Sequence, residues 1–387
     1  MSYSLSAAHL PADLPADLPA DPREFFTDVR VVELPMTTRF RGITSRQVCL
    51  LRGPEDWAEF SPFPEYGPQE AHRWLAAAVE FSLNPHGSAG LLTPGTSTSS
   101  ASPAKAHEVP PAPAYSGRLS GARVPVNGTV PAVSAEDVPG VLDRFDGVDV
   151  FKIKIAEHGA ASKDADVARV RAVLAAAPNA KIRLDANGKL SIDEAVAHLR
   201  KLITLDGFVQ RLEYVEQPVA NVEDMARLRE RLQADSELCG IRIAADENIR
   251  RSDDPLRVAQ LGAADHIVVK AQPLGGVAAA VRIVQSCGLP ATVSSALESS
   301  IGLAAGAQLA LALAQLGEGA AWAAGLGTAS LLAADVVDHP RRPHGGTIST
   351  DPMDVSVQLA EDHRAPAEAQ EWWLARLAAC WKLLREA

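Results

Sequence analysis

Two lysines in one short run are the first residues whose spacing points to chemistry. Between Phe151 and Ile155 apolar residues alternate with Lys152 and Lys154. Because side chains of a strand alternate between its two faces, this pattern predicts both ammonium groups on one face. Two neighbouring ammonium groups lower each other's pKa, as a lysine acting as a general base at neutral pH requires. The alternative is a solvated pair on an edge strand.

Three carboxylates recur at matching places in later runs. Asp185, Glu216 and Asp246 stand near the ends of KIRLDAN, LEYVEQP and RIAADE. Each one alone would be interpreted as a helix cap or loop residue, but the repetition favours a shared site. Packed carboxylates repel one another and take up protons unless a divalent cation holds them ionised, and oxygen ligands suit Mg²⁺. We therefore predict a metal site formed by these three residues.

A third lysine, Lys270, lies in HIVVKAQPLGG. If its strand is the sixth and that of Lys154 the second in a ring of eight, the two lysines face each other with the carboxylates between them. A substrate carboxylate on the metal would then have its α-carbon between two lysines. This layout predicts removal of an α-proton, with the metal stabilising the enediolate. A lysine that only extends to the solvated rim is the alternative for Lys270.

Repeated strand-like runs, separated by helical patterns, must position these residues. The runs are FKIKIA (151–156), KIRLDAN (181–187), LEYVEQP (212–218), RIAADE (242–247), HIVVKAQ (266–272), ATVSSAL (291–297) and AAGLGT (323–328). The first six start 24 to 31 residues apart, a spacing typical of βα units in a parallel sheet. With 124–133 as a first strand the count is eight, which closes a barrel. An open doubly wound sheet fits the repetition almost equally well.

Composition excludes several classes of function. The 387 residues carry a net charge of −11, which disfavours binding to nucleic acid. The four cysteines are widely spaced and fit a reducing cytoplasm, and the N-terminus does not resemble a signal peptide. The apolar run 301–317 is too short and too rich in glutamine to span a membrane and is expected to be a buried helix. Neither GxxxxGK[ST] nor HExxH occurs, and Gly325-Leu326-Gly327 lacks the third glycine of a dinucleotide loop.

Taken together, these motifs resemble the enolase superfamily, and within it the muconate-lactonising branch. FRGITSR (40–46), EFSPFPEY (59–66), RLDANG (183–188), VEQP (215–218), KAQPLGG (270–276) and SSALESSIGL (294–303) resemble the o-succinylbenzoate synthase family of the actinobacterial kind. The resemblance covers most of residues 25–350. It implies an α/β fold, a modified (β/α)₇β TIM barrel with an α+β capping domain.

The composition of the leader and of the insertion, together with this resemblance for the other segments, predicts a division of the chain. We expect a disordered leader at 1–24, the capping domain at 25–92, a low-complexity insertion at 93–115 and the barrel at 116–335. Residues 336–387 would return to the capping domain and end in an amphipathic helix. That helix would pack on the capping domain or form an oligomer contact.

The resemblance also implies residue roles. The reaction would be the Mg²⁺-dependent dehydration of a succinyl-hydroxycyclohexadiene carboxylate to o-succinylbenzoate in menaquinone synthesis, with Mn²⁺ as a substitute ion. Lys154 would be the base, Lys270 would stabilise the enediolate from the opposite face, and Lys152 would hold the substrate carboxylate. Asp185, Glu216 and Asp246 would bind the metal. The residues expected to orient these ligands are Asn187, Glu247 and Arg183.

Substrate recognition is assigned to the rim of the barrel. The loop 36–46 should close over the site, with Arg39 or Arg41 meeting a carboxylate. The hydroxyl and backbone N–H groups expected to receive the succinyl tail belong to Ser294, Ser295, Gly325 and Gly327. The alternatives are an N-succinylamino acid racemase or dipeptide epimerase of the same branch, and a non-catalytic metabolite-binding barrel. We expect a cytoplasmic protein with a small-molecule carboxylate as its partner, and both a monomer and a homo-oligomer remain open.

Overall fold

The computed structural model describes residues 14–15, 17–83, 121–251, 254–317 and 322–386. Its centre is a parallel sheet in the order β11-β10-β9-β8-β7-β6-β5. The strands are β5 (Gly128–Val130), β6 (Val150–Lys154), β7 (Lys181–Asp185), β8 (Leu212–Glu216), β9 (Ile243–Ala245), β10 (His266–Val269) and β11 (Ala291–Val293). Six of the seven expected runs therefore form neighbouring strands in chain order, which excludes the doubly wound alternative.

The expected eighth strand, 323–328, is reduced to two bridges that close the curled sheet. Ala324 pairs with Val126 beside β5, and Gly325 pairs with Ser294 beside β11, both in the parallel sense. A 3₁₀-helix over Gly327–Leu331 begins at once, so the extended segment is too short to form a regular strand. The expected first strand also differs, because β4 (Arg123–Pro125) leaves the barrel to pair with β12 (Thr347–Ser349).

Helices cover the outer face of the barrel. They are α3 (Val138–Leu142), α4 (Lys163–Ala176), α5 (Ile192–Leu202), α6 (Phe208–Arg211), α7 (Val222–Gln233), α8 (Glu247–Arg250), α9 (Arg257–Gln260), α10 (Val277–Cys287) and α11 (Ser300–Gln315), with a 3₁₀ turn at Gly159–Ser162. The strand residues that face them, such as Ile153, Leu184 and Val215, belong to the main buried core. The run expected as a buried helix at 301–317 is α11. No helix within the described ranges is long and apolar enough to cross a membrane.

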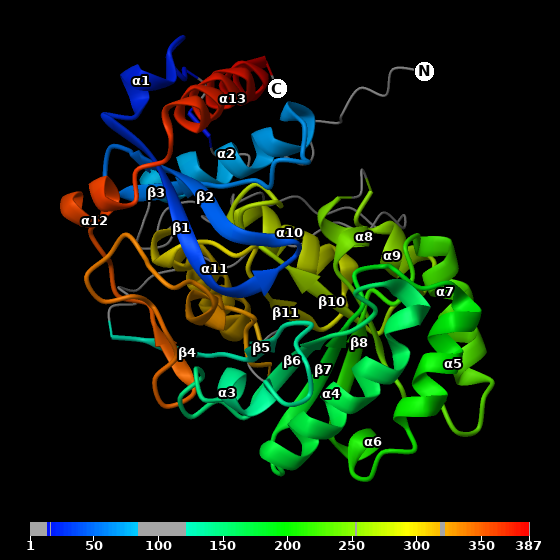
Figure 1. Cartoon of the computed structure of the whole chain (residues 1–387). Helices are drawn as coiled ribbons and strands as arrows, with labels where there is room; N and C mark the ends of the chain where they lie inside the picture. The colour runs from blue at the N-terminus through cyan, green and yellow to red at the C-terminus, as the bar shows by residue number, and fades with distance from the viewer. Residues whose placement is uncertain (1–13, 16, 84–120, 252–253, 318–321, 387) are drawn as a thin grey trace, which may run out of the picture.

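A second layer lies over the carboxyl ends of the barrel strands (Figure 1). It contains an antiparallel sheet of β1 (Asp28–Phe40), β2 (Ile43–Arg52) and β3 (Trp57–Phe60), followed by α2 (Pro68–Leu83). The chain returns to this layer through α12 (Val357–Asp362) and α13 (Ala367–Glu386), and α13 packs beside α2. Trp373, Leu377 and Trp381 of α13 are buried there, so its apolar face is used within the chain.

The segment expected to be a disordered leader is partly structured in the described residues. A short helix, α1, covers Pro22–Phe25, and the Trp381 indole donates to the Pro19 carbonyl at 2.8 Å. Phe25 and Phe26 pack against the same indole. Composition alone does not reveal that this segment is partly buried, because its partner is α13, which lies more than 340 residues away in the sequence. Residues 1–13 and 16 of the leader, and the insertion expected at 93–115, lie outside the described residues.

Candidate active site

Both lysines of β6 face the interior of the barrel and line a pocket at the carboxyl ends of its strands. Their neighbours Phe151 and Ile153 pack on the opposite, helix-facing side in the main core. The alternation of the run therefore predicted the direction of these side chains correctly. Both lysines are buried, which excludes a solvated pair on an edge strand.

One wall of the pocket joins the two lysines to two carboxylates. Lys154 Nζ lies 2.5 Å from Asp185 Oδ2 and 2.6 Å from Asn187 Oδ1. Lys152 Nζ lies 3.0 and 3.1 Å from the two carboxylate oxygens of Glu216, and 3.4 Å from Asp185 Oδ2. Adjacent strands β6, β7 and β8 thus supply one connected set of charges.

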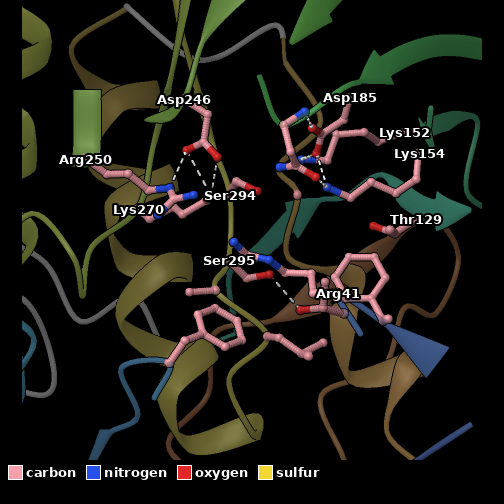
Figure 2. Close-up of a pocket in the computed structure, with 17 residues that line it drawn as sticks. Arg41, Thr129, Lys152, Lys154, Asp185, Asp246, Arg250, Lys270, Ser294 and Ser295 are labelled. Atoms are coloured by element: carbon pink, nitrogen blue, oxygen red, sulfur yellow. Dashed lines mark hydrogen bonds and ion pairs between the residues drawn. The ribbon is translucent and has the colours of Figure 1, made fainter. Parts of the chain in front are cut away.

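The opposite wall is built around a single carboxylate. Lys270 Nζ donates to both oxygens of Asp246, at 2.9 and 2.7 Å. Arg250 Nε donates to Asp246 Oδ1 at 3.2 Å. Figure 2 shows this group across the pocket from Lys152, Lys154 and Asp185, with Ser294 and Ser295 between them. The arrangement agrees with the expected opposition of the second and sixth strands.

Burial and charge act differently on these groups. Burial alone would lower the pKa of Lys152, but Glu216 and Asp185 outweigh it and raise that pKa. The sequence-based expectation of a lowered pKa for Lys152 is therefore wrong in this arrangement. The attraction of the two nearby carboxylates outweighs the repulsion of the neighbouring ammonium group. For Lys270, burial dominates and lowers the pKa, against the opposing effect of Asp246.

The carboxylates show the same competition. Burial would raise the pKa of Asp185 and of Asp246, but nearby cations hold both below their usual values, Lys154 chiefly for Asp185 and Arg250 chiefly for Asp246. For Glu216, burial and the Asp185 charge raise the pKa to about 7. A buried carboxylate held near its titration point by a second carboxylate would be stabilised in its ionised form by a divalent cation.

The donor set fits a hard divalent ion by its chemistry. Asp185, Glu216 and Asp246 are nearly fully buried, come from three consecutive strands and offer only oxygen atoms. Each carboxylate is turned toward a lysine or an arginine, and within the described ranges no group of three His, Cys, Asp or Glu side chains is gathered closely enough to hold a metal. Metal binding would therefore require these carboxylates to exchange part of their ion pairing for coordination.

The residues expected to orient the ligands separate into two groups. Asn187 accepts a hydrogen bond from Lys154 and donates to Glu247 Oε1 at 3.2 Å, so Asn187 and Glu247 adjoin the charged set. Arg183 does not. Its guanidinium donates to Glu213, to Asn127 and to the Ala323 carbonyl, at 2.6 to 2.9 Å, deeper in the barrel.

Most of the expected substrate residues meet at the same pocket. Arg41, Ser294, Ser295 and Gly325 line it. Arg41 lies at the tip of the β1–β2 hairpin, with its guanidinium 4.4 Å from the ring centre of Phe63. Gly327 instead packs against the barrel backbone, where an added Cβ would come within 2.6 Å of the Asn127 carbonyl oxygen.

Some lining residues were missed by sequence reasoning. They are Phe40, Phe63, Thr129, Arg250, Ala296, Leu297 and Thr328. Arg250 had a detectable signal, since it follows Asp246 by four residues in DENIR and so lies one helical turn away. Phe63 comes from the capping layer, and a sequence pattern does not show which barrel residues it will meet.

Comparison with protein families first defines the class. Residues 141–353 match the model described as "Enolase C-terminal domain-like", and residues 31–82 match "Enolase N-terminal domain-like". The chain therefore belongs to the enolase superfamily.

Curated relatives narrow the comparison. A protein of Thermobifida fusca named o-succinylbenzoate synthase is 44% identical over 352 residues, covering 90% of this chain and 95% of its own. A protein of the same name from Mycolicibacterium smegmatis is 42% identical over 356 residues, covering 92% and 96%.

Solved structures agree on the fold. Muconate lactonizing enzyme from Pseudomonas fluorescens, complexed with muconolactone, matches with a TM-score of 0.64 at 20% identity, over 87% of this chain and 98% of that one. The N-succinyl Arg/Lys racemase from Bacillus cereus matches with a TM-score of 0.62 at 16% identity, over 87% and 97%. At these identities the likeness concerns the fold alone. It supports the modified barrel with a capping layer that the sequence motifs implied.

Proposed function

We propose that the chain is an o-succinylbenzoate synthase, which dehydrates 2-succinyl-6-hydroxy-2,4-cyclohexadiene-1-carboxylate in menaquinone biosynthesis. The observation that carries the proposal is the placement of Lys154 and Lys270 on opposite walls of one pocket with acidic residues between them. The names of relatives that match along nearly their whole length support the same reaction.

Asp185, Glu216 and Asp246 would hold Mg²⁺, with Mn²⁺ as a substitute. When bound, the ion supplies a Lewis acid for the substrate carboxylate. Asn187 and Glu247 would limit the movement of the charged groups, because Asn187 accepts a hydrogen bond from Lys154 and donates one to Glu247.

Lys154 would serve as both base and acid. In its neutral form its Nζ takes the proton from the α-carbon of the substrate, and the electron pair of that C–H bond moves toward the carboxylate. The resulting ammonium group then donates the same proton to the departing hydroxyl group. The C–O bond breaks, water leaves and the ring becomes aromatic. One residue on one wall suits a syn elimination, in which both groups leave from the same face.

Lys270 would remain protonated on the opposite face and stabilise the developing negative charge, partly through a cation–π contact with the ring. Lys152, whose pKa is raised by Glu216 and Asp185 against the effect of burial, would stay an ammonium ion and help to hold the substrate carboxylate. Arg41, Ser294, Ser295 and Gly325 line the pocket, where they would receive the succinyl tail.

The direct test is a spectroscopic assay of o-succinylbenzoate formation by purified protein, with and without EDTA. We expect turnover that EDTA abolishes and that added Mg²⁺ restores. A folded protein that forms no product at any Mg²⁺ concentration would contradict the proposal.

A racemase of N-succinylamino acids is the second candidate, because both lysines reach the same pocket and 1,1-proton transfer needs a lysine on each face. Exchange of the α-proton in D₂O separates the two reactions. In a racemase, Lys270→Arg should abolish exchange for one enantiomer only, whereas a dehydratase should keep part of its dehydration activity in this variant.

The proposed setting is the cytoplasm, with a small-molecule carboxylate as the partner. The net charge of −11 supports this choice over a nucleic-acid partner.

A further inference from the structure

Three sequence motifs each contain a buried charged residue that the proposed chemistry leaves without a role, and these residues meet at the junction between the capping layer and the barrel. FRGITSR supplies Arg46 on β2, EFSPFPEY supplies Glu59 on β3, and SSALESSIGL supplies Glu298 after β11. These three side chains are only 2%, 2% and 4% exposed. Burying charged groups is costly unless hydrogen bonds and opposite charges compensate it, so their contacts should reveal their purpose.

Arg46 connects the two layers through backbone carbonyls. Its guanidinium donates to the Leu297 carbonyl at 3.0 Å and to the Ala296 carbonyl at 3.2 Å, both in the barrel. The same group donates to the Ser61 carbonyl of the capping layer and lies 4.3 Å from the ring centre of Phe63. Phe63, Ala296 and Leu297 all line the active-site pocket, so one buried guanidinium fixes two parts of its wall.

Leu297 needs such support because of its backbone conformation. Its φ is +63°, in the left-handed region that residues with a side chain rarely adopt. A backbone of this kind persists only where its surroundings hold it. Arg46 binds the carbonyls of the two peptide units that flank Leu297, those of Ala296 and of Leu297 itself, and the Glu298 carboxylate accepts from the Ala296 N–H at 2.6 Å.

Glu59 holds the following helix from the capping side. Its Oε2 accepts from the backbone N–H groups of Ser299, at 3.0 Å, and Gly302, at 3.2 Å, at the start of α11. A Cβ at position 302 would come within 2.8 Å of the Glu59 carboxyl carbon, so glycine permits this close approach. Ser299 is the N-cap residue of α11, and a capping-layer strand therefore supplies a second acceptor for the first N–H groups of this barrel helix, directly after the pocket wall.

We propose that Arg46 and Glu59 are positioning residues that fix the Ala296–Leu297 wall of the pocket against the capping domain and thereby set its fit to the substrate. The identity of that substrate rests on the proposed function. The contacts themselves do not depend on which substrate binds. An experiment can therefore contradict the positioning role without contradicting the proposed function, and the reverse.

The test uses Arg46→Lys in the full-length protein, with Arg211→Lys as the matched control. Arg211 also donates to three backbone carbonyls, those of Leu174, Ala177 and Ala180, but it lies at the amino-terminal end of the barrel, directly before β8. Lysine keeps the positive charge but lacks the planar guanidinium group, whose several N–H donors can bind more than one carbonyl at once. Calorimetric binding of o-succinylbenzoate in the presence of Mg²⁺, kcat, KM and the melting temperature would be measured for each variant.

We expect Arg46→Lys to weaken o-succinylbenzoate binding and to raise KM by about tenfold, the effect of losing one or two charge-assisted hydrogen bonds, with kcat within about threefold of wild type. Arg211→Lys should leave binding and KM unchanged, even where it lowers the melting temperature equally. Unchanged binding in Arg46→Lys, or a loss confined to kcat, would overturn the proposal.

Hydrogen exchange of the backbone amides at 294–300, without ligand, separates this proposal from the proposed function. Faster exchange in Arg46→Lys than in Arg211→Lys supports the positioning role even if wild-type protein neither binds o-succinylbenzoate nor forms it. Equal exchange overturns it. If Arg46→Lys does not fold, Glu59→Gln keeps the shape of the side chain and removes its charge, and the same increase in exchange at 294–300 is expected.

Discussion

The barrel interior contains two layers of side chains that differ in chemistry although the same strands supply them. Each of the six strands from β6 to β11 sends at least two residues inward, two positions apart. The upper layer, at or just beyond the carboxyl ends, is Lys154, Asp185, Glu216, Asp246, Lys270 and Ser294. The lower layer is Lys152, Arg183, Tyr214, Ala244, Val268 and Thr292, together with His266 at the start of β10, which packs against Tyr214 and Thr292.

The lower layer is a packed plug. The ring of Tyr214 stacks on His266 at 4.9 Å, and Trp322 meets His266 edge-on at 4.5 Å. Arg183 lies over Tyr214 and is held by Asn127 and other partners. Lys152 is the exception in this layer, because its amine extends upward to Glu216.

The upper layer consists almost entirely of ion pairs. The packed lower layer explains how these charges can interact so strongly. A plug without access for water keeps the charges above it in a medium of low dielectric constant, where their mutual interactions are strong. Apart from Lys152, the strand positions two residues earlier contribute rigidity rather than chemistry. Substitutions in the upper layer should therefore change catalysis, and substitutions in the lower layer should change stability.

The largest effect is expected for Lys154→Ala in the upper layer. Loss of the group that moves the proton should lower kcat by about 10³-fold or more, with little change in folding stability. Lys181→Ala is the control, because Lys181 lies at the opposite end of β7, is exposed and donates to the Gln210 carbonyl. Steady-state kinetics and thermal unfolding of both variants check the prediction, and retained activity in Lys154→Ala would mean that another group is the base.

Asp246→Asn should have the next largest effect. The carboxylate that pairs with Lys270 and Arg250 would lose its charge, and we expect the Mg²⁺ concentration needed for half-maximal activity to rise by about 100-fold. Titration of Mg²⁺ against activity and by calorimetry measures the shift. Asp265→Asn, which alters an ion pair with Arg229 before the start of β10, should reduce stability and leave the Mg²⁺ titration unchanged. Equal titrations for the two variants would remove Asp246 from the metal site.

Alternation and spacing predicted inward-facing lysines and consecutive parallel strands, whereas the choice of a barrel over an open doubly wound sheet depended on the motif resemblance. The period of two in the run from Phe151 to Ile155 predicted which side chains face inward, and the regular starts of six runs predicted neighbouring parallel strands. Both signals are local, since they depend on residues within one strand or one βα unit. The opposition of Lys154 and Lys270 then followed from counting strands.

Contacts between distant segments could not be predicted in this way. Arg46 meets Leu297 across 251 residues, and Trp381 meets Pro19 across 362. Neither contact produces a periodic pattern in the sequence, because the capping layer and the barrel each have a pattern of their own. The interpretation of Arg183 failed for a related reason. It shares a face with Asp185 but lies two residues earlier on β7, and its partners there, Glu213 and Asn127, are not part of the motif.

Substitution of His266 in the lower layer should have the smallest effect on catalysis. It should instead change how the stability of the protein depends on pH. Burial, helped by the charges of Arg183 and Arg242, lowers the pKa of His266 to about 3, whereas a histidine in the unfolded chain has its ordinary pKa of about 6.5. The folded protein therefore keeps this ring neutral while the unfolded chain takes up a proton. Stability is complete above about pH 6.5 and is lost as the pH falls from there toward 3.

Between pH 7 and pH 5 this linkage should cost the wild-type protein about 2 kcal/mol of unfolding free energy. His266→Gln, whose amide can keep a hydrogen bond to the Thr292 hydroxyl that lies 2.8 Å from His266 Nε2, should lose that part of the pH dependence while kcat at pH 7 stays within about twofold. His339→Gln, at an exposed position, should retain the wild-type pH dependence. Urea unfolding at both pH values measures the difference. If His266→Gln loses as much stability on acidification as the wild-type protein, the lower layer is not the dry plug on which the contrast between the layers depends.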